Sequence, residues 1–255
     1  MSNLPDDKRS RALSLLNKDI TKSPKRPSVQ MKEAAAQEAS MAQVNKIFLV
    51  FDATASREPT WQMAMRQQMS TARALQDIGK FVVGIAAHSG GRAKFLGWHD
   101  NPADAAHAMS QLDCNAGDTN YIDTFALLQE EVRKGNTADV TIMFGDCCEE
   151  YPEDVIKAAT ALNVPVFALH EDTGHGADKG KKVFRALAHA TGAAFDELEN
   201  YQAVVTAIAA LLKGKQKDLT GEARIVMERL TRDNPNILRL SDLRNPPALE
   251  GPNRG

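Results

Sequence analysis

Short apolar runs alternate with amphipathic segments along the middle of the 255-residue chain. Apolar runs of four to seven residues, bounded by turn residues, predict strands buried on both faces. They occur at 47–51, 81–87, 140–144 and 164–169, and residues 194–197 are a possible last strand. Segments with apolar residues at intervals of three and four predict helices, and they lie at 60–78, 101–112, 121–134, 153–162, 182–191 and 201–212. Residues 93–98 predict a short edge strand. The alternation predicts an α/β fold around a mostly parallel sheet.

The two ends of the chain depart from this pattern and predict three regions. Residues 1–44 are polar and proline-broken, and favour a flexible arm with possible short helices at 10–20 and 31–44. A helix that docks on a partner is the alternative for this arm. Residues 45–213 hold the α/β domain. Residues 214–255 predict a helix at 220–232 and a proline-rich extended tail, whose one apolar segment, Ile237–Leu243, could dock on a partner or back on the domain.

Composition limits the classes of partner and compartment. The formal net charge is −2 and the pI is near 6.3, which argues against a protein that coats nucleic acid or a membrane surface. The three cysteines, Cys114, Cys147 and Cys148, are too few for a disulfide framework. The N-terminal residues lack the pattern of a signal peptide. We therefore expect a cytoplasmic protein.

Oxygen-bearing side chains follow two of the predicted strands. Asp52, Thr54 and Ser56 stand at alternate positions after the run 47–51, so in an extended segment they point the same way. Asp146 follows the run 140–144, and Thr119 lies in a loop before a predicted helix. Ligands of open α/β sheets bind beyond the carboxyl ends of the strands. Such hard oxygen donors suit Mg²⁺, Mn²⁺ or Ca²⁺ better than zinc or copper.

These positions resemble the metal-ion-dependent adhesion site (MIDAS) of the von Willebrand factor A (vWA) domain family. The family pattern D-x-[S/T]-x-S reads Asp52-Ala53-Thr54-Ala55-Ser56, its second element reads Gly117-Asp118-Thr119-Asn120, and its third reads Gly145-Asp146. Cys147 replaces the glycine that usually follows the aspartate. The resemblance covers about residues 43–212. It implies a doubly wound, six-stranded sheet with helices on both faces, and an antiparallel edge strand at 93–98.

The same resemblance implies a function. The metal ligands would be Asp52, Thr54, Ser56, Thr119 and Asp146, and the ion would be Mg²⁺ (or Mn²⁺ or Ca²⁺). An acidic residue of a partner protein would complete the coordination, so the chain would be an adaptor rather than an enzyme. The family's bacterial relatives suggest a partner such as a ring-shaped AAA ATPase.

Several alternatives compete with this interpretation. Asp, Ser and Thr at a strand–helix junction often cap helices, so Thr119 could simply cap the helix at 121. The acidic residues Glu149, Glu150, Glu153 and Asp154 could draw cations toward the site or repel acidic partners, but they suit the first turn of their own helix, which favours the structural role. A metal-dependent hydrolase using the same oxygens, and a scaffold with a vestigial site, also remain open.

Other enzyme classes fit less well. A thiol enzyme would use Cys147 or Cys148 with His170 or His175 as base, although buried structural cysteines fit better. Position 54 lacks the second aspartate of a dehalogenase-type phosphotransferase. The chain has neither a G-x-G-x-x-G motif after its first strand nor a P-loop. His88, His170 and the loop after 169 are expected to be solvated, near the rim of the site.

Overall fold

The structure is a computed structural model that describes residues 44–58, 75, 78–174, 176–197 and 201–242. Six strands form one sheet in the order β3-β2-β1-β4-β5-β6. Their bounds are β1 Asn45–Asp52, β2 Phe81–Ser89, β3 Arg92–His99, β4 Val140–Gly145, β5 Val166–His170 and β6 Phe195–Glu197. Every neighbouring pair is parallel except β2 and β3, which pair antiparallel at one edge. The predicted doubly wound sheet and its antiparallel edge strand are confirmed.

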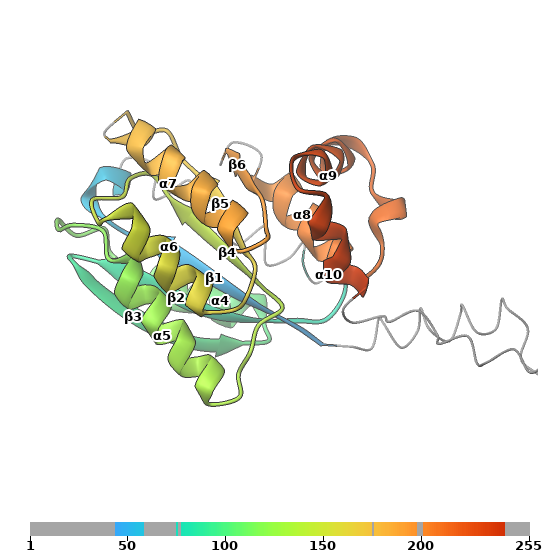
Figure 1. The fold of residues 1–255 in the computed structure, drawn as a ribbon. Helices are drawn as coiled ribbons and strands as arrows, with labels where there is room; N and C mark the ends of the chain where they lie inside the picture. Colours follow the sequence, from blue (N-terminus) through green and yellow to red (C-terminus); the bar gives the residue numbers. More distant parts are fainter. Residues whose placement is uncertain (1–43, 59–74, 76–77, 175, 198–200, 243–255) are drawn as a thin grey trace, which may run out of the picture. The chain divides into compact units, whose positions relative to one another are not determined.

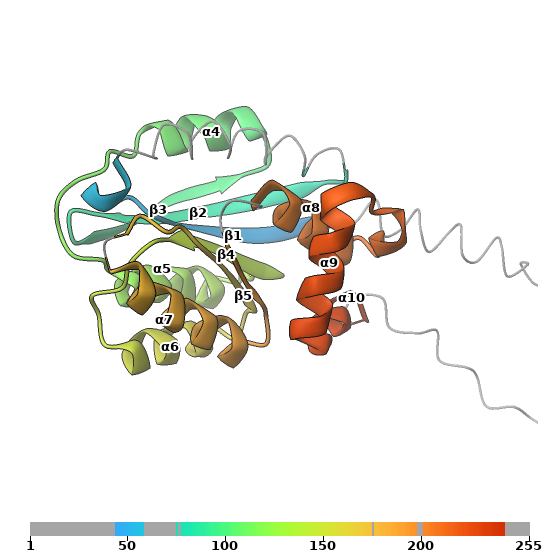
Figure 2. The ribbon, with the colours of Figure 1, turned by 90° about the horizontal axis from the view of Figure 1, so that it is seen from above.

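Helices cover both faces of this sheet (Figures 1 and 2). The helices between or after the strands are α4 Pro102–Ser110, α5 Tyr121–Arg133, α6 Pro152–Ala161, α7 Ala177–Ala190 and α8 Tyr201–Leu212. The short helix η1, Ala55–Arg57, follows β1. Figure 2 shows α4 on one side of the strands and α5, α6 and α7 on the other. The described helices agree with the predicted ones to within a few residues at most ends. The helix predicted at 60–78 falls almost entirely outside the described residues.

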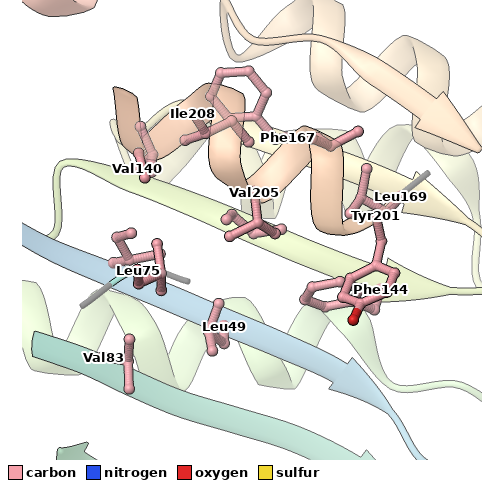
Figure 3. Close-up of a cluster of buried hydrophobic side chains, with 14 of the residues drawn as sticks. Leu49, Leu75, Val83, Val140, Phe144, Phe167, Leu169, Tyr201, Val205 and Ile208 are labelled. Atoms are coloured by element: carbon pink, nitrogen blue, oxygen red, sulfur yellow. The ribbon is translucent and has the colours of Figure 1, made fainter. Parts of the chain in front are cut away.

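The alternation of side chains along β1 divides the core into two layers. Ile47, Leu49 and Phe51 pack into one layer with α4 and α8. Phe48 and Val50 point to the opposite face and pack with α5, α6 and α7. Figure 3 shows the first layer, in which Tyr201, Val205 and Ile208 of α8 lie over the central strands. A strand buried on both faces explains why β1 reads as a continuous apolar run.

Helix α7 begins at Ala177, five residues earlier than the predicted 182. Gly180 made the segment 170–180 look like a glycine-rich loop. Here the glycine serves close packing instead of a turn, because a Cβ at position 180 would collide with the backbone carbonyl of Asp146. The first turn of α7 thereby reaches the carboxyl end of β4.

The C-terminal region packs back on the domain. It contains η3 Gln216–Asp218, α9 Gly221–Asp233, η4 Pro235–Leu238 and α10 Arg239–Asp242. The helix predicted at 220–232 is confirmed, but residues 235–242 are helical rather than extended. Ile237 is fully buried in the same core layer as Val226, Met227 and Leu230 of α9. Of the two places where the apolar segment at 237 could dock, the structure therefore favours the domain itself.

Candidate functional site

The carboxyl ends of β1 and β4 meet where the order of the strands reverses. Phe51 of β1 pairs with Phe144 of β4, so the residues that follow, Asp52 and Asp146, emerge at the same edge of the sheet. From β1 the chain runs to β2 and β3 on one side, and later to β4, β5 and β6 on the other. This topological switch point is where open α/β sheets bind ligands. Both aspartates are fully buried there.

Asp52 is held as an anion by the groups around it. Its Oδ1 accepts a hydrogen bond from the backbone N–H of Thr54 at 3.0 Å, and its Oδ2 accepts one from the Tyr121 hydroxyl at 3.2 Å. The Nε2 of His88, its neighbour in register on β2, lies 3.4 Å from Oδ1. Burial alone would raise the pKa of Asp52, but His88, Arg57 and Thr54 together hold it well below its usual value.

Asp146 has the opposite environment. Its Oδ2 accepts a hydrogen bond from the Thr173 hydroxyl at 2.8 Å, whereas its buried Oδ1 has no hydrogen-bond partner among the described residues. Burial, and next the charge of Asp52, raise the pKa of Asp146. The hydrogen bond from Thr173, and next the Ser56 hydroxyl, oppose this rise only in part. A second buried carboxylate beside Asp52 is thus under-compensated in charge.

Ser56 and Thr54 join the two carboxylates. Their hydroxyl oxygens lie 3.0 Å apart. Thr54 also touches Asp52 through its backbone, and Ser56 reaches Asp146. Ser56 is exposed while Thr54 is buried, so this set of oxygens opens to solvent at Ser56. Four of the five residues predicted to hold a metal are therefore brought together.

Thr119 belongs to a different set of contacts. Its hydroxyl accepts a hydrogen bond from the backbone N–H of Glu149 at 3.1 Å, and its own N–H donates to the Glu149 carboxylate at 3.0 Å. No hydrogen bond in the described part of the chain joins Thr119 to the other four residues. It does not cap α5 either, because Asn120 occupies that position and accepts from the N–H of Asp123.

The loop between β4 and α6 makes hydrogen bonds to the start of α5 as well as leading into α6. The carboxylate of Glu150 accepts hydrogen bonds from the N–H groups of Tyr121 and Ile122, at 2.6 and 2.9 Å. These N–H groups are two of the four that a helix start leaves without internal partners. The prediction that Glu149 and Glu150 serve only the first turn of α6 is wrong. Glu153 and Asp154 do lie in that turn.

Five supporting residues escaped sequence reasoning or were misjudged by it. The Arg57 guanidinium is fully buried, donates from Nη1 to the Asp52 carbonyl at 2.8 Å, and donates from Nε to Glu171 at 2.9 Å. His170 is buried and bonds the Asp146 carbonyl from Nε2 at 3.1 Å. Thr173 and Tyr121 bond the two carboxylates directly. His88 is also buried, so the expectation that His88 and His170 are solvated rim residues is wrong. The one sequence feature that pointed to any of these supporting roles is that Arg57 directly follows the predicted ligand Ser56.

The neighbouring cysteines are poor nucleophiles. Burial, and next the Glu149 carboxylate, raise the pKa of the Cys147 thiol to about 11. Burial, and next Glu150, raise that of Cys148 to about 12. Because the thiolate is the reactive form, a thiol-enzyme mechanism has no support here. Cys147 also occupies the place of the glycine expected after Asp146, and Gly176 leaves room for its sulfur.

The oxygen set fits a hard divalent cation. Two buried carboxylates side by side repel each other, one of them has an orphaned oxygen, and two hydroxyls flank them. Such oxygens are the ligands that Mg²⁺ prefers. Among the described residues no group of three or more His, Cys, Asp or Glu side chains is placed to hold a metal, so any ion here would depend on hydroxyls, water or a partner for its remaining ligands.

The sequence matches no family model and no curated protein, but the fold matches solved structures. A von Willebrand factor type A protein from Catenulispora acidiphila aligns with a TM-score of 0.52 at 16% identity, over 68% of this chain and 43% of that one. BatB from Bacteroides thetaiotaomicron aligns with a TM-score of 0.52 at 14% identity, over 68% of this chain and 99% of that one. An aerotolerance-related membrane protein from Bacteroides fragilis NCTC 9343 aligns with a TM-score of 0.54 at 12% identity, over 67% and 99%.

At these identities the likeness concerns the fold alone. The chain spans less than half of the first of these proteins and nearly the whole of the other two. None of the helices within the described ranges is both long and apolar enough to cross a membrane. The strand order, the antiparallel edge strand and the solved neighbours agree, and the described strands and helices of the sheet have the α/β fold of a vWA domain.

Proposed function

We propose that this chain is a vWA-type interaction module that grips an acidic residue of a partner protein through a divalent cation of the Mg²⁺ type. Asp52, Asp146, Ser56 and Thr54 would hold the ion. A bound cation would supply an open coordination position for the partner's carboxylate. The observation that carries the proposal is the pair Asp52 and Asp146, which are buried side by side with one carboxylate oxygen unpartnered.

The ligand set explains why binding is favoured over catalysis. Asp52 and Asp146 carry at most two negative charges, and the hydroxyls of Thr54 and Ser56 carry none. Two directly bound carboxylates would balance the two charges of the ion, so the ion keeps positive character where an aspartate holds it through water. A partner carboxylate would then approach from the solvent side, where Ser56 is exposed. The partner's identity is a further part of the proposal, and a ring-shaped AAA ATPase is the class that the family resemblance suggests.

Thr119 would add a further oxygen to this set. Its hydroxyl accepts a hydrogen bond from the Glu149 N–H, and its second lone pair is left for an ion.

A scaffold without metal is the second candidate, and one observation favours it. The Asp52 carboxylate has His88 and Tyr121 beside it, and Arg57 is bonded to its backbone carbonyl. These groups compensate Asp52 without an ion. In that case the vWA fold would serve as a platform whose recognition surface does not depend on metal.

A thermal-shift experiment separates the candidates. A module that binds Mg²⁺ or Mn²⁺ is stabilised by mass action, by about 2.7 kcal/mol when the free ion is at 100 times its Kd. We expect the melting temperature of the full chain to rise with either ion, and to rise less in Ser56→Ala. Ser110→Ala, an exposed serine at the end of α4, is the matched control and should respond like the wild type.

The alternatives predict other results. No ion-dependent rise in any variant would favour the metal-free scaffold. Metal-dependent turnover of a phosphoester such as p-nitrophenyl phosphate, abolished in Ser56→Ala, would instead support the hydrolase alternative.

A further inference from the structure

The outer face of α7 borders a groove that the metal-site proposal does not use. One part, with a volume of about 570 Å³, is lined along the helix by Asp178, Lys181, Lys182, Arg185, Ala186 and His189. The adjoining part, about 440 Å³, is lined by Arg185, His189, Ala193, Ala194, Phe195, Asp233 and Asn234. Arg185 and His189 line both parts, so the two parts meet at these side chains and are treated together as the α7 groove. Figure 1 shows α7 beside β5, and β6 and α9 farther along the chain.

The groove is basic at its centre although the whole chain is slightly acidic. Lys182, Arg185 and His189 are exposed on the face of α7 opposite its buried residues. None of the three has an ion-pair partner among the described residues, whereas Lys181 is paired with Glu197. Lys182 and Arg185 carry the charge of this cluster, since the net charge of −2 for the chain counts histidine as neutral. They give the groove a local positive potential.

The groove is also preformed. The Arg185 guanidinium lies over the ring of Phe195, with 4.8 Å to the ring centroid, which fixes it at the junction of the two parts. Asn234 donates to the Ala193 carbonyl at 2.8 Å, and Arg229 pairs with Asp196. These contacts tie the end of α9 to the strand β6 and its approach. A binding surface that is already ordered loses less conformational entropy when a ligand binds.

The lining points to one class of occupant. The partly exposed Phe195, whose ring lies under Arg185, is the main apolar residue of the lining, and the nearly buried Ala193 and Ala194 lie beside it in the chain. Asp178 and Asp233 contribute carboxylates toward the two ends, which would repel a long polyanion such as a nucleic acid. From Asp178 to His189 the helix rises about 16 Å at roughly 1.5 Å per residue, which an extended segment of about five residues would span.

We propose that this groove binds a short acidic segment of a partner protein, with an apolar side chain against Phe195 and carboxylates at Lys182, Arg185 and His189. Arg185 presents a planar fork that matches a carboxylate. The site is separate from the metal-site residues, so this proposal stands or falls independently of the proposed function.

Fluorescence anisotropy with a synthetic probe tests the proposal. The probe is a labelled peptide in which four glutamates alternate with leucines, and its control has glutamines in place of the glutamates. We expect the full chain to bind the glutamate peptide, more weakly at about 300 mM than at about 50 mM NaCl because exposed charges are screened. It should bind the glutamine peptide at least about tenfold more weakly, a difference of about 1.4 kcal/mol.

Charge reversal locates the binding. The double variant Lys182→Glu, Arg185→Glu should lose at least about tenfold in affinity for the glutamate peptide. Lys157→Glu, an exposed lysine of α6, makes the same kind of charge change outside the groove and should lose less than about twofold. The melting temperature of each variant shows whether it is folded. Arg185→Lys, which keeps the charge without the fork, should give an intermediate affinity.

Three results would overturn the proposal. The first is no binding of the glutamate peptide by the wild type at low salt. The second is an equal loss in Lys157→Glu and in the double variant. The third is a single-stranded oligonucleotide probe that binds more tightly than the peptide and is lost in the same double variant, which would assign the groove to nucleic acid.

Discussion

At the scale of single residues, the two aspartates are chemically alike but sit in different surroundings. Asp52 is surrounded by donors and cationic groups that lower its pKa, whereas burial and Asp52 itself raise the pKa of Asp146. The sequence places both carboxylates at strand ends but is silent about these surroundings. Arg57, Tyr121 and Thr173 come from three separate segments, and only the folded chain brings them to the carboxylates.

The raised pKa of Asp146 gives a test of stability without metal. The folded state binds the Asp146 proton more tightly than the unfolded state, whose pKa is near 3.8. Ionised Asp146 therefore destabilises the fold at neutral pH, and this penalty disappears as the pH falls through the raised pKa. Asp146→Asn keeps an acceptor for Thr173 and removes the charge. We expect it to melt about 2–4 °C higher than the wild type at pH 7 per kcal/mol relieved.

The pH dependence supplies the control for that comparison. The melting-temperature difference between Asp146→Asn and the wild type, measured in a chelator, should shrink as the pH is lowered from 7 toward 4. Asp52 works in the opposite direction, because its stabilising charge is lost only below the ordinary value near 3.8. A difference that is negative at pH 7, or that grows on acidification, would contradict the assignment for Asp146.

At the scale of elements, the spacing of apolar residues along the chain identifies most strands and helices. It does so because both faces of the sheet are buried, so each element must present apolar side chains to the core. Ile47, Leu49 and Phe51 pack in one layer, and Phe48 and Val50 pack in the other. A strand needs apolar side chains on both faces only when both of its faces are buried. The start of α7 was missed because glycine normally signals a turn, whereas Gly180 is needed for close approach to Asp146. The role of Glu150 was missed because its partner helix, α5, begins about thirty residues earlier in the chain.

Glu150 gives a prediction for α5. Its carboxylate takes two N–H groups at the start of that helix, so Glu150→Ala should destabilise the fold by about 1–2 kcal/mol, as loss of a helix cap does. Glu153→Ala removes an exposed glutamate from the first turn of α6 and should cost about 0.5 kcal/mol or less. Urea denaturation measures both values. Equal losses in the two variants would show that Glu150 does not support α5.

At the scale of the whole molecule, the vWA-like sheet and the C-terminal helices share one core. Proline content predicted an extended tail beyond α9, because prolines break helices. A single apolar side chain overrides that tendency at Ile237, which is fully buried beside Met227 and Leu230. The alternation of strands and helices allows the strand order to be anticipated. The docking of the segment around Ile237 depends on the folded surface of α8 and α9, so the sequence alone does not predict it.

Two adjacent residues test this docking. Ile237→Ala empties a fully buried position and should cost about 2–4 kcal/mol in the free energy of unfolding. Leu238 is 41% exposed, and Leu238→Ala should cost about 1 kcal/mol or less. Losses of similar size, measured by urea denaturation, would mean that η4 does not pack against the domain as described.

The central claim is that Asp52 and Asp146 share a divalent cation with neighbouring hydroxyls. Isothermal titration calorimetry of Mn²⁺ into the chelator-treated full chain tests it most directly, with Asp146→Asn and Ser56→Ala as ligand variants and Ser110→Ala as control. We expect one site per chain in the wild type and in Ser110→Ala. Affinity should fall at least about tenfold in Asp146→Asn and to a lesser extent in Ser56→Ala. A wild type that binds no Mn²⁺, or an Asp146→Asn variant that binds it as tightly as the wild type, would show that the two aspartates do not hold a shared ion.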